Sequence, residues 1–135
     1  MKTTLFAFLF LAATFFTVAQ ERIKTKPFDP AFVHVVYIWL KNPDSEADRT
    51  RFEASLNKFL DHSKFAKTNY IGIPPKATRG VVDDSFTYNL IVTFGSAEAQ
   101  DRYQTEKAHL VFIEECKDLW NRVLVYDSKG LPNER

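Results

Sequence analysis

The sequence predicts an α+β domain in which helices cover one face of a four-stranded antiparallel sheet. Three observations predict this class. Residues 86–94 alternate between apolar and mostly polar side chains with the period of a strand. Residues 52–60 carry apolar side chains at the spacing of a one-faced helix. The length of 135 residues, 45% of them hydrophobic, suits one compact domain.

The N-terminal 19 residues have the pattern of an export signal. Lys2 precedes an uncharged apolar run, residues 5–16, and small residues before Gln20 fit cleavage after Ala19. The run is shorter than the roughly 20 residues of a membrane-spanning helix, so we expect cleavage and no membrane attachment afterwards. The pattern predicts a secreted or periplasmic protein with a signal peptide at 1–19, a linker at 20–30, a domain at 31–128 and a C-terminal tail at 129–135.

Charge and cysteine content exclude several classes of function. The chain has 18 basic and 17 acidic residues, and without residues 1–19 the two counts are equal. A neutral protein has no basic excess for a phosphate backbone, so we expect no nucleic-acid partner. The single cysteine, Cys116, allows neither an internal disulfide nor a cysteine-rich zinc site, and its place on an apolar helical stripe predicts burial.

The first strand is expected over residues 32–40, which are almost continuously β-branched or aromatic. One of its faces carries Phe32, His34, Val36, Ile38 and Leu40. The other carries Val33, Val35, Tyr37 and Trp39. One helix layer covers only one of these apolar faces, so we expect a second copy of the chain to cover the other in a homodimer.

The next elements are a helix and a weak strand. Asp44 or Ser45 can cap the helix, whose apolar stripe consists of Phe52, Leu56, Phe59 and Leu60. Residues 68–73 then indicate a short or edge strand that ends before Pro74. A charged loop, residues 76–85, leads to the third strand at 86–94, which places Tyr88 on its apolar face.

Two helical stretches and a last strand complete the chain. Ser96 caps the first stretch, which carries Ala99 and Tyr103 four residues apart. The second has an inward stripe of His109, Phe112, Ile113 and Cys116, continued by Leu119 and Trp120. Residues 122–126 then form a β-rich run before a polar tail. The order βαββαβ is that of the split βαβ, ferredoxin-like arrangement.

Four segments in this order resemble the stress-responsive A/B barrel (Dabb) family. They are FVHVVYIWLK at 32–41, RGVVDDSFTYNLIVTF at 79–94, YQTEKAHLVF at 103–112 and VLVYD at 123–127. The resemblance covers about residues 31–128. It implies a dimeric α/β barrel in which each subunit keeps a cavity between its sheet and its helices. Some members of the family are associated with stress responses, and plant relatives act as polyketide cyclases.

The cyclase-type relatives line this cavity with a tyrosine and a histidine six residues apart, and with a second histidine on the first strand. The corresponding residues here are Tyr103, His109 and His34. The relatives carry a histidine-proline pair before the helical histidine, and this chain has Glu106-Lys107-Ala108 instead. Six residues of unbroken helix leave two side chains about 120° apart, so both can face one cavity only if the helix breaks between them.

The residues themselves allow two chemistries and one structural role. His109 can act as a base on a carbon next to a carbonyl while Tyr103 donates a hydrogen bond to the oxyanion. Alternatively, both are cavity-wall residues that bond to backbone carbonyls. Glu106 and His109 also have the i, i+3 spacing of carboxylate-bridged metal sites, but no second matching motif accompanies them. We therefore expect no metal and no cofactor.

Two functions follow from these alternatives. The favoured one is a homodimer that binds a small hydrophobic molecule, with His34, Tyr88 and Phe112 as ligand-binding residues. The cavity candidates as a set are Phe32, Tyr88, Phe94, Tyr103, Phe112 and Trp120. The other function is a cofactor-free enzyme, cyclase-like or monooxygenase-like, that acts on a carbonyl compound with His109 and Tyr103 as catalytic residues.

Overall fold

The computed structural model describes residues 28, 29 and 31–132, so the predicted signal peptide and most of the predicted linker lie outside the described residues. The elements follow in the order β1 (Phe32–Leu40), α1 (Glu46–His62), β2 (Thr68–Gly72), β3 (Tyr88–Phe94), α2 (Ala97–Thr105), α3 (Lys107–Cys116) and β4 (Trp120–Lys129). This order confirms the predicted α+β class and the ferredoxin-like arrangement of a four-stranded antiparallel sheet with helices.

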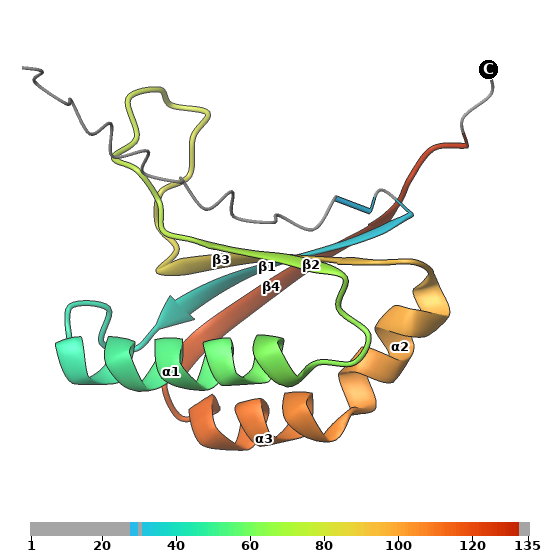
Figure 1. The fold of residues 1–135 in the computed structure, drawn as a ribbon. Helices are drawn as coiled ribbons and strands as arrows, with labels where there is room; N and C mark the ends of the chain where they lie inside the picture. Colours follow the sequence, from blue (N-terminus) through green and yellow to red (C-terminus); the bar gives the residue numbers. More distant parts are fainter. Residues whose placement is uncertain (1–27, 30, 133–135) are drawn as a thin grey trace, which may run out of the picture.

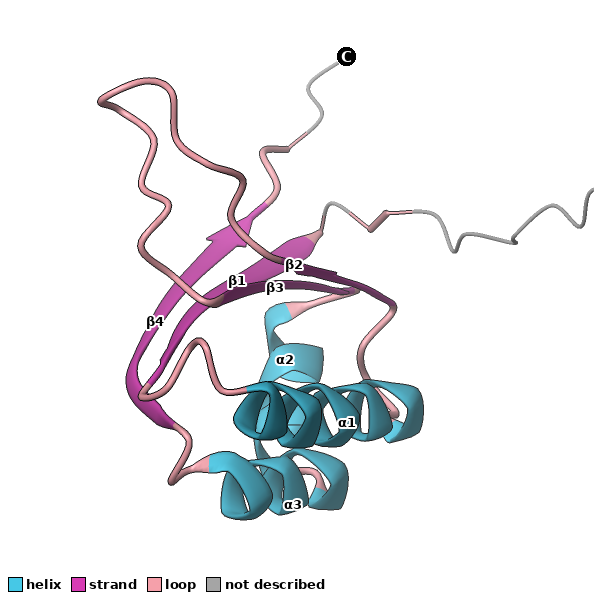
Figure 2. Cartoon of the chain, turned by 90° about the vertical axis from the view of Figure 1, so that its left-hand side faces the viewer, coloured by secondary structure: helices cyan, strands magenta, loops and turns pink. Residues whose placement is uncertain are grey.

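The sheet has the strand order β2-β3-β1-β4, so β1 is central and β2 is an edge strand as predicted. All three helices lie on one face of the sheet, and α1 and α3 run side by side (Figures 1 and 2). The long loop between β2 and β3 extends on the opposite side of the sheet (Figure 2). The opposite sheet face therefore carries no helix within the described part of the chain.

The two faces of β1 differ in burial as the alternation predicts. Every residue from Phe32 to Leu40 with an even number is buried against the helices, and every odd-numbered one is half-buried. The strand register puts apolar neighbours beside the half-buried residues on the outer face, namely Tyr70, Ile91, Leu124 and Tyr126. The outer face is therefore rich in aromatic and aliphatic side chains, and no helix of the described residues covers it.

Local capping explains where the helices begin. The Ser45 side chain accepts a hydrogen bond from the Asp48 amide at 3.3 Å, so Ser45, and not Asp44, is the N-cap of α1. Ser96 caps α2 in the same way through the Ala99 amide, at 3.2 Å. None of the helices in the described residues is long and apolar enough to cross a membrane.

The last strand departs from the sequence prediction at both ends. The apolar stripe does not continue as helix to Trp120, because α3 ends at Cys116 and Trp120 already pairs with Leu40 in the sheet. Asp127 does not begin a polar tail, because it pairs with His34 as part of β4. The central strand β1 thus provides pairing partners for polar residues that show no strand pattern of their own. Cys116 is buried, as expected.

Candidate functional site

A cavity of about 280 Å³ lies between the inner face of the sheet and the helices α2 and α3. Its lining residues are His34, Val36, Ile38, Phe59, Leu90, Tyr103, Gln104, His109, Phe112, Ile113, Trp120, Val123 and Val125. The structure therefore brings together four of the five predicted site residues, His34, Tyr103, His109 and Phe112. The fifth, Tyr88, does not line this cavity.

A break between α2 and α3 lets Tyr103 and His109 face the same space. Glu106 stands between the two helices with extended backbone angles, φ −68° and ψ 149°, although no proline is present. The rings of Tyr103 and His109 have centroids 5.2 Å apart. The break that the sequence geometry requires is thus present, even though the family's histidine-proline pair is missing.

The side chain of Glu106 accounts for the position of this break. Its carboxylate accepts hydrogen bonds from the Ser63 hydroxyl at 2.5 Å and from the Lys64 amide at 3.0 Å, just after α1 ends. A side chain held by the neighbouring helix end fixes the backbone at the junction. In this chain, the hydrogen bonds from Ser63 and Lys64 to Glu106 hold the junction immediately before Lys107, the residue at the position of the relatives' proline.

Aromatic rings hold the polar side chains of the cavity in place. The Tyr103 ring packs edge-on against His34, with centroids 5.9 Å apart, and against Phe94 at 4.9 Å. Phe59 of α1 contacts both Tyr103 and His109, with centroid distances of 5.1 Å and 5.2 Å. Such contacts restrict rotation, so the cavity is organised before any ligand enters.

The backbone fixes the tautomer of His109. Its Nδ1 lies 3.0 Å from the carbonyl oxygen of Gln104, and a carbonyl only accepts, so Nδ1 carries the hydrogen. The lone pair is therefore on Nε2. Burial lowers the pKa of His109 below its usual value of 6.5, against a smaller opposite effect of the Gln104 bond. His109 is thus neutral near pH 7, with a basic nitrogen available.

Tyr103 is almost fully buried, yet none of the described residues forms a hydrogen bond with its hydroxyl group. Burial raises the pKa of Tyr103, with a smaller contribution from the negative charge of Glu106. The phenol is therefore protonated at neutral pH and able to donate. A free donor that lines a cavity of apolar walls is suited to a carbonyl or hydroxyl oxygen of a ligand.

His34 has a carboxylate partner that orients it. Its Nδ1 lies 2.6 Å from Oδ1 of Asp127 on the neighbouring strand β4, and the His34 side chain is 5% exposed. The ionised carboxylate only accepts, so Nδ1 donates and the orientation of the ring is fixed. Asp127 thus positions His34 from outside the set of residues that line the cavity.

Tyr88 has a different environment. Its hydroxyl donates a short hydrogen bond to Glu53, its ring stacks on Phe52 with centroids 4.9 Å apart, and Arg49 lies over the ring face. Burial and the Glu53 bond raise the pKa of Tyr88. The hydroxyl is already satisfied, so Tyr88 closes the packed end of the core and has no group left for a ligand.

Besides several aliphatic wall residues, the site contains Phe59, the Gln104 carbonyl and the partner of His34, none of which is identified from the sequence. The sequence predicts Phe59 only as part of the core stripe of its helix, and the Gln104 carbonyl carries no sequence signal. Asp127 did have a signal, because residues 123, 125 and 127 share one face if the strand period continues past Tyr126. That face is the one that carries His34.

The site shows no arrangement for a metal. Among the described residues, no group of three or more histidine, cysteine or acidic side chains is close enough to hold an ion. The Glu106 carboxylate of the i, i+3 pair is bound to Ser63 and the Lys64 amide instead. The chemistry that these residues can perform is therefore proton transfer and hydrogen bonding.

The sequence itself identifies the class of protein. The family model of the Stress responsive A/B Barrel Domain, Dabb, matches residues 32–129. The match spans well over half of the chain, and the chain therefore belongs to the Dabb family. A comparison with curated proteins finds no match.

Solved structures share the fold at low sequence identity. A hydroxynitrile lyase from Passiflora edulis is similar with a TM-score of 0.65 and 18% identity, over 79% of this chain and 100% of that one. A Dabb family protein with a ferredoxin-like fold from Mesorhizobium loti gives 0.62 and 18%, over 74% and 96%. A dimeric ferredoxin-like protein of unknown function from Thermobifida fusca gives 0.58 and 9%, over 73% and 89%.

Proposed function

We propose that the protein is exported, assembles as a homodimer through the outer face of its sheet, and binds a small hydrophobic molecule in the cavity of each subunit. The observation that carries the proposal is the cavity of about 280 Å³, where apolar walls surround His34, Tyr103 and His109. Apolar pockets with a few converging polar groups are the usual form of small-molecule sites. The volume is below the usual range for drug-sized ligands, so we expect a one-ring alcohol, aldehyde or ketone.

The two tryptophans of the chain allow a direct binding test. Trp120 lines the cavity, whereas Trp39 lies on the outer face, where its indole donates to Ser85. In the variant Trp39→Phe, fluorescence reports on the cavity alone. Titration with benzyl alcohol, hexanal and cyclohexanone is expected to give a saturable change for at least one compound.

A cavity-filling variant tests whether the fluorescence change comes from binding in the cavity. Val125 lines the cavity and is 44% exposed, so Val125→Phe fills space without disrupting the core, and it is expected to abolish the saturable change. Val81→Phe is the matched control, because Val81 is 88% exposed in the loop. Two results would contradict binding in the cavity. One is a fluorescence response that stays unchanged when Val125→Phe is added to Trp39→Phe, and the other is no response of Trp39→Phe to any of the compounds.

The outer face of the sheet supports a homodimer. It exposes Tyr126 by 58% and Tyr70 by 57%, beside half-buried Leu124 and Tyr37. A contiguous surface of this kind is typical of an interface. The T. fusca structure of the same fold is described as dimeric. We expect Leu124→Arg to sediment as a monomer at micromolar concentration and the unmodified protein as a dimer. A monomeric unmodified protein would contradict the assembly.

Export rests on the sequence of residues 1–19 alone. Cleavage after Ala19 predicts a mature protein that begins with Gln20. Fractionation of the native host followed by N-terminal sequencing tests this expectation. Recovery from the cytoplasm with Lys2 and the apolar run still attached would contradict export.

The alternative function is a cofactor-free enzyme, and one observation favours it. His109 and Tyr103 line the same cavity with ring centroids 5.2 Å apart, and they offer an unprotonated Nε2 and a hydroxyl donor. A base and a donor of these kinds are the groups needed to remove a proton next to a carbonyl while the oxyanion is stabilised. The same fold occurs in the hydroxynitrile lyase from P. edulis.

Exchange of carbon-bound hydrogen tests this activity without a known substrate. The C–H proton passes to Nε2 of His109, and a deuteron from D2O returns to the same carbon, so atoms balance. Cyclohexanone in D2O is expected to lose its α-proton signals faster with the protein than with buffer, and His109→Ala is expected to abolish the gain. Exchange at the buffer rate, or unchanged exchange in His109→Ala, would exclude this reaction.

A further inference from the structure

A second and larger hollow lies on the other side of the helix layer, between α1 and α3. It has a volume of about 600 Å³ and is separate from the candidate site. Its floor is apolar and consists of Phe59, Phe65, Ala108, Val111 and Phe112. We refer to this hollow as the interhelical groove. The volume is within the usual range for ligand sites.

Hydrogen bonds join the segments that border the interhelical groove at both of its ends. At one end, the Glu115 carboxylate accepts from the Ser55 hydroxyl at 2.5 Å and from Lys58 at 3.2 Å. At the other end, Glu106 accepts from Ser63 and from the Lys64 amide. The two helices are therefore held together at their ends, while small or flat side chains leave the space between them open.

The carboxylates of the groove accept hydrogen bonds from neighbouring protein groups, whereas two of its lysines form no ion pair with a described residue. Hydrogen bonds from Ser55 and Lys58 hold the pKa of Glu115 below its usual value, so the carboxylate is ionised and occupied by donors. Lys64 and Lys107 also line the groove, and neither forms an ion pair with any described residue. The Glu106 end of the groove thus carries two ammonium groups that lie beyond ion-pair distance of any carboxylate among the described residues, while the Glu106 carboxylate accepts from Ser63 and the Lys64 amide.

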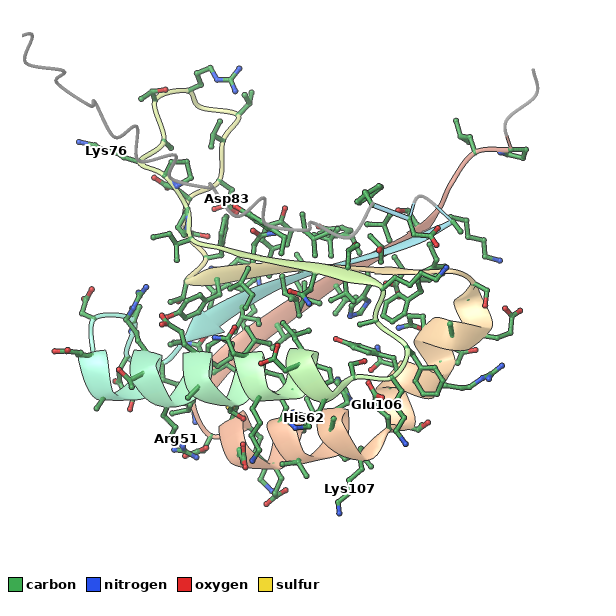
Figure 3. All side chains as sticks on the ribbon, in the orientation of Figure 1. Arg51, His62, Lys76, Asp83, Glu106 and Lys107 are labelled. Atoms are coloured by element: carbon green, nitrogen blue, oxygen red, sulfur yellow. The ribbon has the colours of Figure 1, made fainter. Side chains whose placement is uncertain are left out.

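The side-chain view places the charged groups relative to the apolar floor. His62 and Glu106 lie at the same end of the helix pair, and Lys107 extends from the start of α3 at that end, pointing away from both (Figure 3). His62 donates its Nδ1 hydrogen to the Lys58 carbonyl, 2.7 Å away. The charged side chains therefore lie at the ends of the groove, and apolar side chains form its floor.

We propose that the interhelical groove is a second binding site, for an amphipathic carboxylate whose alkyl chain lies on the Phe59, Val111 and Phe112 floor and whose head group meets Lys64 and Lys107. An alkyl chain complements an apolar floor, and a carboxylate complements two unpaired ammonium groups. The groove runs along residues 55–62 of α1, which span about 10 Å, so a medium-length chain fits it.

The Phe59 and Phe112 rings separate this groove from the candidate site. They stack with centroids 5.3 Å apart and an interplanar angle of 15°, and both residues line both spaces. The two sites therefore have a common wall and no common polar residue. Binding in the groove does not depend on the function proposed for the inner cavity.

Isothermal titration with sodium decanoate, below its micelle concentration, tests the proposal on the whole protein. We expect saturable binding of decanoate and none of decyltrimethylammonium, which has the same chain and the opposite charge. The double variant Lys64→Glu/Lys107→Glu is expected to weaken decanoate binding about tenfold. Both side chains are exposed, so the variant should fold normally.

Two controls make the result specific. Lys76→Glu changes the charge of an exposed lysine on the opposite side of the sheet (Figure 3) and is expected to leave affinity within about twofold. Val125→Phe fills the inner cavity and is also expected to leave decanoate binding intact. Absent binding, equal binding of the two amphiphiles, an unaffected lysine variant, or loss of binding in Val125→Phe would each overturn the proposal.

Discussion

Tyr88 and Tyr103 lie at opposite ends of the same interface between sheet and helices, and their surroundings differ. Both residues are at most 2% exposed, and burial raises the pKa of both hydroxyls. Tyr88 pairs across the sheet with Ile38, donates to Glu53 and stacks on Phe52. Tyr103 lies over His34, lines the cavity and donates to no described residue.

This difference shows that burial alone does not separate a structural tyrosine from a candidate functional one. The distinguishing feature is whether the polar group has a partner. A buried group without one loses its bonds to water and gains nothing in return. No side-chain polar atom of the described residues is both sealed from solvent and unbonded. The Tyr103 hydroxyl therefore faces space in which a ligand or water can accept its hydrogen, whereas the Tyr88 hydroxyl donates to Glu53 and contributes to stability.

The largest expected effect is at the packed end. Phe52 is fully buried and contacts the rings of Tyr88, Phe112 and Trp120, so Phe52→Ala is expected to lower the free energy of unfolding by about 3–5 kcal/mol. Val123→Ala at the open end is expected to cost under about 1 kcal/mol, because Val123 is 42% exposed. Urea denaturation measures both. Similar losses would show that the two ends are equally packed.

The tyrosine hydroxyls provide a closer comparison. Tyr88→Phe removes the donor to Glu53 and is expected to cost about 1–3 kcal/mol of unfolding free energy. Tyr103→Phe removes a group with no partner among the described residues and is expected to change stability by less than about 0.5 kcal/mol. Denaturation of the two variants side by side gives the answer. A larger loss for Tyr103→Phe would reverse the assignment of roles.

The helix junction is expected to show an intermediate effect. Glu106→Ala removes the acceptor for the Ser63 hydroxyl and the Lys64 amide, which we expect to cost about 1 kcal/mol in the unfolding free energy. It should also weaken the response of Trp120 to ligand, because the angle between α2 and α3 sets the cavity. Glu98→Ala, in the first turn of α2, is a matched control. Full stability and an undiminished ligand response in Glu106→Ala would show that the break between α2 and α3 does not depend on the Glu106 hydrogen bonds.

The smallest effect concerns pH. The pKa of His109 is lowered in the folded protein, so the unfolded chain binds more protons between that lowered pKa and about 6.5. Stability therefore falls as pH decreases through this window. His109→Gln is expected to flatten the decrease between pH 7 and pH 5, measured as urea midpoints. An equally steep decrease in the variant would assign the pH dependence to other groups.

The elements that could be predicted from the sequence are those with a strong period. The burial of β1 alternates residue by residue as its pattern indicates, and Ser45 and Ser96 cap the helices that follow them. The sequence predicts the last strand only over 122–126, whereas β4 also includes Asp127 and its neighbours, which join the sheet through pairing with β1 and have no apolar pattern. Whether such residues belong to a strand depends on their pairing with a neighbouring strand and not on their local preference.

The candidate site was predictable only in part, for a similar reason. The resemblance to the family predicts a shared cavity for His34, Tyr103 and His109, and the apolar helical stripe predicts an inward Phe112. The helix break at Glu106 is what lets Tyr103 and His109 line the same space. Tyr88 shares the apolar face of its strand with cavity residues, and only the Glu53 and Phe52 contacts set it apart. Contacts between elements far apart in sequence carry no signal in a single chain.

The most direct test of the proposed binding function is a crystal structure of the protein with whichever one-ring compound binds most tightly. We expect the ring of the ligand among Ile38, Phe112 and Trp120, with its oxygen within hydrogen-bond distance of the Tyr103 hydroxyl. A ligand bound elsewhere, or a cavity that side chains have closed while the Tyr103 hydroxyl bonds to the protein, would contradict it.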